Sequence, residues 1–249
     1  MTIKYFDIER EYPIKCKAFL PDDSNVKMFI LGVHGFAGDK ESSALLELAN
    51  VITPEGAAVI CFDFPAHGDS PTDESKLTVE NCKSDLLAVA KWAEDSFPQA
   101  EKSVFATSFG GYISLLAADN LTEYKMVLRA PAVTMPKVLL ESVLNVTAKQ
   151  FKKAGIIECG FERKIRLPYS FYQDLVCFDL YEKNYDNPIL VIHGNKDDVV
   201  PINDVIKFCA NRKNTSLIVI DNADHRFKNK GEIERIVYET IWFMELSIK

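Results

Sequence analysis

The chain has 249 residues, of which 47% are hydrophobic and 26% charged, so it is long enough and apolar enough to bury a sizeable core. A formal net charge of −7, with no run of lysine or arginine, argues against nucleic acid or an anionic membrane as the main partner. No stretch approaches the ~18 consecutive apolar residues of a membrane span, no signal peptide is evident, and the six cysteines are scattered without a C-x-x-C pair. We therefore expect a cytoplasmic protein with free thiols and no metal site.

Seven segments predict β-strands, and six of them are near-continuous apolar runs. Residues 12–20 instead alternate, with Ile14, Cys16 and Ala18 on one face. Continuous apolar runs are typical of strands that are buried on both faces, as in a parallel sheet covered by helices. These runs are residues 28–35, 57–64, 103–107, 125–131, 188–194 and 216–221.

Helical patterns separate the predicted strands. In residues 232–246, for example, Ile233, Ile236 and Val237 belong to one apolar stripe. The alternation of strand and helix predicts an open α/β sheet, whose functional site lies at the carboxyl ends of the strands. The other predicted helices are residues 41–52, 79–97, 108–118 and 202–210.

Residues 133–187 interrupt this alternation, because no parallel strand fits there. We expect a helical segment over residues 137–153, followed in residues 154–175 by short strands or a hairpin around Gly155 and Gly160. This segment is interpreted as a small cap over the sheet, and residues 1–132 and 188–249 as the core. Its Tyr169, Tyr172 and Gln173 are candidate substrate contacts. The two tyrosines are equally expected to pack the cap onto the sheet.

Ser108 lies at the junction between a predicted strand and a predicted helix. Around it, Ala106-Thr107-Ser108-Phe109-Gly110 has the form small-x-Ser-x-small, a variant of the nucleophile elbow G-x-S-x-G. Small flanking residues are needed because the chain turns sharply there. The turn exposes the serine Oγ at the start of a helix, where partial positive charge favours a developing oxyanion.

Two further loops supply the acid and the base that a serine nucleophile needs. Asp197 and Asp198 follow one predicted strand, and His225 follows the next. A serine hydroxyl attacks only when a base removes its proton, and the base needs an acid that fixes its tautomer. The order serine, aspartate, histidine along the chain is that of α/β hydrolases.

A glycine-punctuated loop, residues 32–38, follows the first apolar strand. Its Phe36 backbone N–H, together with the N–H of Phe109, is a candidate pair of donors for an oxyanion hole. His34, His67 and His193 each precede a glycine at a strand end, and we expect them to hold loops through their ring nitrogens. Asp63 and Asp69 are expected to stabilise their own loop by Asx-type hydrogen bonds.

In chain order, these motifs resemble the α/β-hydrolase superfamily over nearly the whole chain. The cinnamoyl (feruloyl) esterase-like group is similar in its H-G-F-x-G loop, its D-x-x-x-H-G-x-S loop and its cap. One departure is Ala106, where the first glycine of the elbow is usual. The matching motifs are His34-Gly35-Phe36, the loop from Asp63 to Ser70, Ser108 in its elbow, His193-Gly194-x-x-Asp197 and Asp224-His225-x-Phe227.

The resemblance implies a mostly parallel, eight-stranded sheet flanked by helices, and its H-G-x-x-D spacing favours Asp197 over Asp198 as the acid. It also implies a serine carboxylester hydrolase that forms an acyl-enzyme and needs no cofactor or metal. The substrate would be a small-molecule ester, with a hydroxycinnamoyl or a short-chain acyl group. An acyl thioesterase, a monoacylglycerol-type lipase, a peptidase and a ligand-binding receptor on a hydrolase scaffold stay open as alternatives. A homodimer is one open oligomeric state.

Overall fold

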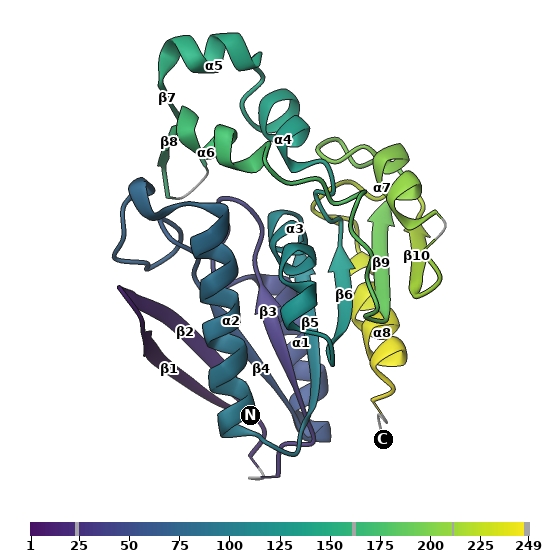
Figure 1. Ribbon diagram of the computed structural model, residues 1–249. Coiled ribbons are helices and arrows are strands. Elements are labelled where there is room, and N and C mark those ends of the chain that lie inside the picture. Colours follow the sequence, from purple (N-terminus) through teal and green to yellow (C-terminus); the bar gives the residue numbers. More distant parts are fainter. Residues whose placement is uncertain (23–24, 161–162, 211, 247–249) are drawn as a thin grey trace.

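The computed structural model describes residues 1–22, 25–160, 163–210 and 212–246, and it is built around one eight-stranded sheet (Figure 1). The strand order is β1-β2-β4-β3-β5-β6-β9-β10. The β1–β2 and β2–β4 pairs are antiparallel, and all other neighbours are parallel. This confirms the predicted α/β-hydrolase architecture. The strands are β1 Thr2–Glu9, β2 Pro13–Leu20, β3 Met28–Val33, β4 Ala57–Phe62, β5 Glu101–Thr107, β6 Lys125–Arg129, β9 Ile189–Gly194 and β10 Thr215–Ile220.

All seven predicted strands form, whereas β1 was not predicted. Its side chains are mostly exposed, because it is an edge strand whose only neighbour in the sheet is β2. A strand with so little burial lacks the apolar pattern that identified the others.

Helices cover both faces of the sheet, and the sheet separates the buried apolar side chains into two clusters. The helices α1 and α8 contact each other on one face, and α2 and α3 contact each other on the opposite face (Figure 1). Each helix buries its apolar stripe against the strands, as the sequence predicted. The helices of the sheet layers are α1 Ser43–Ile52, α2 Val79–Ser96, α3 Phe109–Leu116, α7 Ile202–Cys209 and α8 Glu232–Met244, with 3-10 turns at Thr53–Glu55, Glu74–Lys76 and Ala118–Asn120.

Within the segment of residues 133–187, the helices and strands lie beyond the carboxyl ends of the parallel strands of the large sheet (Figure 1). Strands β7 and β8 form the expected antiparallel hairpin. The division of the chain into core and cap stays a prediction. The elements of this segment are α4 Met135–Val138, a π-helical turn Leu139–Val143, α5 Ala148–Ala154, β7 Ile156–Cys159, β8 Ile165–Pro168 and α6 Tyr169–Leu175.

Two details of this segment correct the sequence analysis. The continuous helix expected over residues 137–153 is wrong, because the chain leaves the helix after the π-helical turn and a new helix, α5, begins after Thr147. Thr147 and Gln150 form a capping box, in which each side chain bonds to the other residue's backbone N–H, and this starts α5 independently. The hairpin also ends earlier than expected, since Tyr169–Leu175 is helical.

The helix that follows Ser108 packs very closely on β3 and its following loop. A Cβ atom on Gly110 would lie 2.5 Å from the His34 carbonyl oxygen and 2.6 Å from that of Val33. Only glycine therefore allows the start of α3 to come this close to the loop that carries Phe36. None of the helices in the described ranges is both long and apolar enough to cross a membrane.

Candidate active site

Three loops at the carboxyl ends of the strands bring Ser108, His225 and Asp197 into one hydrogen-bonded chain. Ser108 follows β5, Asp197 follows β9 and His225 follows β10. The Ser108 Oγ lies 3.1 Å from His225 Nε2, and His225 Nδ1 lies 2.8 Å from an Asp197 carboxylate oxygen. In this geometry His225 can take a proton from Ser108 while Asp197 holds the other ring nitrogen protonated.

The backbone at Ser108 is held in an unusual conformation, with φ of 50° and ψ of −112°. A non-glycine residue with positive φ costs of order 1–3 kcal/mol and persists only where its surroundings fix it. Here the Ser108 N–H donates to the Arg129 carbonyl at 2.9 Å, and the Ser108 carbonyl accepts from Tyr112 and Ala132 at 3.1 Å each. These bonds to β6, to α3 and to the chain after β6 hold the serine at the tip of the turn.

Asp197 is a buried carboxylate whose hydrogen bonds are well satisfied. Its Oδ1 accepts from the backbone N–H groups of Val199 and Val200 at 2.9 and 2.7 Å, while Oδ2 faces His225. Burial raises its pKa, but the bonds from His225 and the two amides lower it further, so that the net pKa lies below the usual value. The exposed Asp198 makes no hydrogen bond to His225 in the described structure, and the geometry therefore selects Asp197 of the two candidates.

Phe36 and Phe109 lie beside each other at Ser108. Their rings are perpendicular, with centroids 5.9 Å apart, and a Cβ on the neighbouring Gly35 would lie 3.4 Å from the Ser108 Cβ. Within the described residues, neither the Phe36 nor the Phe109 N–H donates to a protein acceptor. Both donors are thus available for an oxyanion, although this role stays a prediction.

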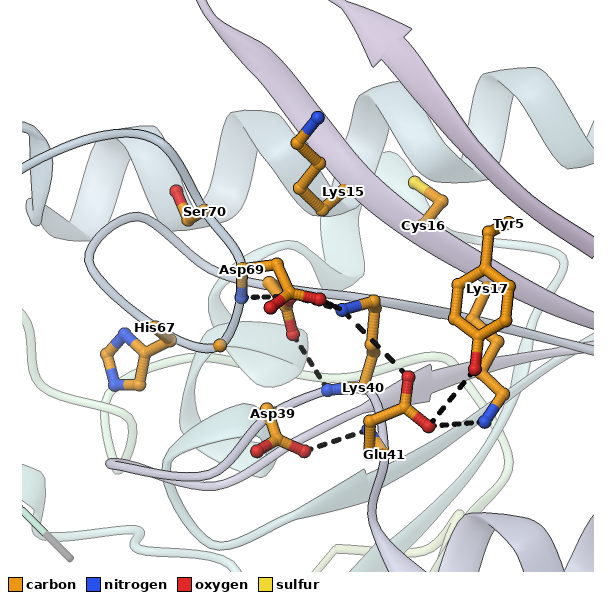
Figure 2. A network of polar contacts seen from close by, with 12 residues as sticks. Tyr5, Lys15, Cys16, Lys17, Asp39, Lys40, Glu41, His67, Asp69 and Ser70 are labelled. Atoms are coloured by element: carbon orange, nitrogen blue, oxygen red, sulfur yellow. Dashed lines mark hydrogen bonds and ion pairs between the residues drawn. The ribbon is translucent and has the colours of Figure 1, made fainter. Parts of the chain in front are cut away.

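A buried lysine that the sequence analysis did not single out, Lys40, fixes the loop that carries Phe36 (Figure 2). Its Nζ lies 2.8 Å from Asp63 and also bonds Asp69, and its backbone N–H donates to Asp63 at 2.8 Å. Burial lowers the pKa of Lys40, but the two carboxylates raise it above its usual value, so Lys40 stays protonated. The only signal in the sequence was a lysine directly after the glycine-rich loop.

Asp63 therefore stabilises more than its own loop. It also accepts the Asp69 N–H at 2.8 Å, and a Cβ on Gly68 would lie only 2.4 Å from its carboxylate. The bonds with Lys40 link two segments far apart in the chain, whereas the bond from Asp69 stabilises the loop after β4 itself, as expected. As a result, the loop after β3 and the loop after β4 form one unit.

The other three histidines lie outside the chain from Ser108 to Asp197 and contact backbone groups. His34 bonds the Gly35 carbonyl and accepts the Phe64 N–H, and burial lowers its pKa to about 4. His67 bonds the Pro65 carbonyl. His193 bonds the Val200 carbonyl at 3.0 Å and lies 3.3 Å from Asp197, and burial lowers its pKa as well.

A cavity of about 480 Å³ opens between Ser108 and the segment of residues 133–187. Phe36 and His225 line it beside Ser108, and Glu158, Lys164 and Arg226 add charged groups to its wall. The rest of the lining is largely aliphatic. These aliphatic or sulfur-containing residues are Met135, Val138, Val143, Leu144, Ile157, Cys159 and Val199.

Tyr169, Tyr172 and Gln173, the predicted substrate contacts, do not line this cavity. The two tyrosine rings instead pack against each other, with centroids 5.7 Å apart, and against Phe151. Residues 169–175 form a helix, α6, from which Tyr169 and Tyr172 contact Phe151.

Arg163 joins the hairpin to the loop after β4. Its guanidinium donates to four backbone carbonyls, those of His67, Gly68, Ser70 and Thr72. No group of three or more histidine, cysteine or acidic side chains suited to a metal ion occurs in the part of the chain that the structure describes.

Comparison with known proteins places this geometry in context. A family model described as the alpha/beta hydrolase fold matches residues 29–155, about half of the chain. The mitochondrial palmitoyl-protein thioesterase ABHD10 of Bos taurus is 23% identical over 219 residues, which cover 84% of this chain and 70% of the relative.

Solved structures show the same fold. Est1E from Butyrivibrio proteoclasticus, with ferulic acid bound, superposes with a TM-score of 0.82 at 21% identity, over 97% of this chain and 98% of the other. The mouse alpha/beta hydrolase domain-containing protein 10 gives a TM-score of 0.77 at 19% identity, over 98% and 99% of the two chains.

The buried pair of Lys40 and Asp63 makes a testable prediction about stability. Lys40→Met leaves the fully buried Asp63 carboxylate without its counter-ion, and we expect the free energy of unfolding to fall by about 3–5 kcal/mol. Lys15→Met, which removes an ammonium from a half-exposed pair with Asp7, should cost less than about 1 kcal/mol. Urea denaturation measures both, and equal losses would contradict the structural role given to Lys40.

Proposed function

Because the chain belongs to the α/β-hydrolase fold family, we propose that it is a serine hydrolase that cleaves carboxylic esters or thioesters through an acyl-enzyme. One observation carries this proposal, namely the unbroken hydrogen-bonded chain from the Ser108 Oγ through His225 to the buried Asp197. A ligand-binding receptor would not need a nucleophile, a base and an acid aligned at the strand ends.

In the proposed reaction, the Ser108 Oγ attacks the acyl carbon while His225 Nε2 takes the serine proton. Asp197 stabilises the resulting imidazolium, and the N–H groups of Phe36 and Phe109 donate to the oxyanion. When the tetrahedral intermediate collapses, His225 gives the proton to the departing alcohol or thiol. Water then attacks the acyl carbon of the acyl-enzyme while His225 takes a proton from the water. His225 returns this proton to the Ser108 Oγ as the acid is released, which restores Ser108.

The cavity beside Ser108 supports an aliphatic acyl group. Phe36 is the only aromatic residue among its described lining residues apart from His225, and the aliphatic side chains offer no flat surface for a hydroxycinnamoyl ring. The thioesterase relative is consistent with this preference. Hydrolysis of a thioester needs the same nucleophile, base and oxyanion donors as hydrolysis of an ester, so both leaving groups belong to the proposal.

The cytoplasmic location expected from the sequence stays a prediction. The ABHD10 relatives carry the word mitochondrial in their names, and the described helices say only that none of them could span a membrane. The oligomeric state likewise stays a prediction.

Replacement of the nucleophile provides the direct test of the proposal. Ser108→Ala should fold normally and lower kcat/KM for p-nitrophenyl butyrate by at least about 10³-fold, because no other group can form the acyl-enzyme. A fluorophosphonate probe should label the wild-type protein at Ser108 and leave the variant unlabelled, as read by mass spectrometry of peptides. Full activity of the variant, or no labelling of the wild type, would refute the proposal.

The two neighbouring aspartates provide a matched test of the acid. Asp197→Asn presents an amide N–H or a weaker acceptor to His225 and should lower kcat by about 10³–10⁴-fold. Asp198→Asn makes the same chemical change at the exposed neighbour and should leave kcat unchanged. Equal effects of the two substitutions would show that His225 is not oriented by Asp197.

The acyl preference can be tested with one leaving group and two acyl groups. We expect a higher kcat/KM for p-nitrophenyl octanoate than for p-nitrophenyl ferulate, because the cavity beside Ser108 is lined mainly by aliphatic side chains. The reverse order would indicate that the cavity reshapes around an aromatic acyl group. Ser108→Ala serves as the blank for both substrates.

A further inference from the structure

A second cavity, of about 300 Å³, also reaches Ser108 and His225. Besides these two residues it shares Phe36, Ala37 and Arg226 with the aliphatic cavity, but the rest of its wall is different. Hydroxyl, backbone and guanidinium groups replace the aliphatic side chains, and none of its lining residues carries a carboxylate. The side chains that distinguish it are those of Ser43, Thr107 and Arg129.

Arg129 is the last residue of β6, and its position is tied to that of the nucleophile. Its carbonyl accepts the Ser108 N–H at 2.9 Å, so the arginine and the serine lie on neighbouring strand ends. The residue is only 8% exposed. Its guanidinium lies 4.9 Å from the centre of the Phe227 ring, and one terminal nitrogen donates to the Arg226 carbonyl at 2.7 Å.

The guanidinium of Arg129 has no counter-ion in the described structure. No carboxylate oxygen of a described residue forms an ion pair with it, and its Nε is buried without a hydrogen-bond partner. Burial lowers the pKa of Arg129 to about 10, while the more distant charges of Asp224 and Asp197 act to raise this pKa. The guanidinium therefore stays protonated at neutral pH. A buried cation without a counter-ion is costly, whereas the buried Lys40, close to Phe36 in the chain, is paired with two carboxylates.

We infer that Arg129 binds an anionic oxyacid group, a carboxylate or a phosphate, on the leaving-group part of the substrate. The planar guanidinium presents parallel N–H groups that match two oxygens of such an anion. This inference rests on the proposed hydrolase function. If the acyl chain occupies the aliphatic cavity, the second cavity receives the alcohol or thiol part, and the absence of carboxylates from its wall favours negative charge there.

Three esters that share a butyryl group test the inference on the wild-type protein. They are p-butyryloxybenzoate, p-butyryloxyphenyl phosphate and the neutral p-butyryloxybenzamide. After division by the rate of alkaline hydrolysis of each ester, kcat/KM for at least one anionic ester should exceed that for the amide by at least about tenfold. The carboxylate and phosphate arms identify which anion the site prefers. Equal values for all three esters would overturn the inference.

Variants assign the preference to Arg129. Arg129→Gln should reduce the ratio of anionic to neutral kcat/KM toward one, and Arg129→Lys, which keeps the charge without the planar fork, should give an intermediate ratio. Arg166→Gln removes the same charge from an exposed arginine outside both cavities and should keep the wild-type ratio. An unchanged ratio in Arg129→Gln would overturn the inference.

Binding to Ser108→Ala separates this inference from the proposed function. Calorimetry should show that the inactive variant binds the preferred anionic ester at least about tenfold more tightly than the amide, and that adding Arg129→Gln removes the difference. If the wild type cleaves none of the esters, the hydrolase proposal fails while the binding preference is still measured. If the esters are cleaved but bind equally well, only the anion site fails.

Discussion

The hydrogen bond from the Ser108 N–H to the Arg129 carbonyl is the contact on which the rest of the site depends. It closes the end of the β5–β6 pair and holds Ser108 at positive φ, where its Oγ meets His225. Because the same bond fixes the end of β6, it also places the Arg129 guanidinium beside the nucleophile. The strain at the elbow and the position of the buried cation thus share one cause, which is the register of two parallel strands.

The three buried charges near this contact, those of Asp197, Lys40 and Arg129, differ in the partners that surround them. Asp197 is buried, but amides and His225 satisfy its oxygens, so it can stay ionised next to the base. Lys40 is buried between Asp63 and Asp69, and their attraction binds the loop of Phe36 to the loop after β4. Arg129 alone among these groups lacks an opposite charge in the described structure, and a substrate anion would supply one. The satisfied charges of Asp197 and Lys40 hold the loops of the site in place, whereas the charge of Arg129, which lacks a counter-ion, is suited to binding a substrate anion.

The segment of residues 133–187 shows where sequence reasoning failed and why. Apolar periodicity predicted one helix over residues 137–153, but the capping box at Thr147 starts a separate helix that periodicity alone does not reveal. Tyr169 and Tyr172 are aromatic residues of the predicted cap, yet α6 turns them toward Phe151. The residues that line the aliphatic cavity instead come from α4, the π-helical turn, the hairpin and the loop after β9. Their convergence depends on how these short elements pack, which no local pattern encodes.

The sequence by itself determined seven of the eight strands of the sheet, the helices that cover it and the three loops that carry Ser108, Asp197 and His225. Continuous apolar strands are buried on both faces, and parallel strands bring their carboxyl ends to one edge, so residues that follow such strands must come close together. The structure alone decided that Lys40 spans two loops, which side chains form each cavity wall, and that Arg129 is left without a counter-ion. These features depend on contacts between residues far apart in the chain, and on burial, which sets the cost of a charge only after the fold is complete.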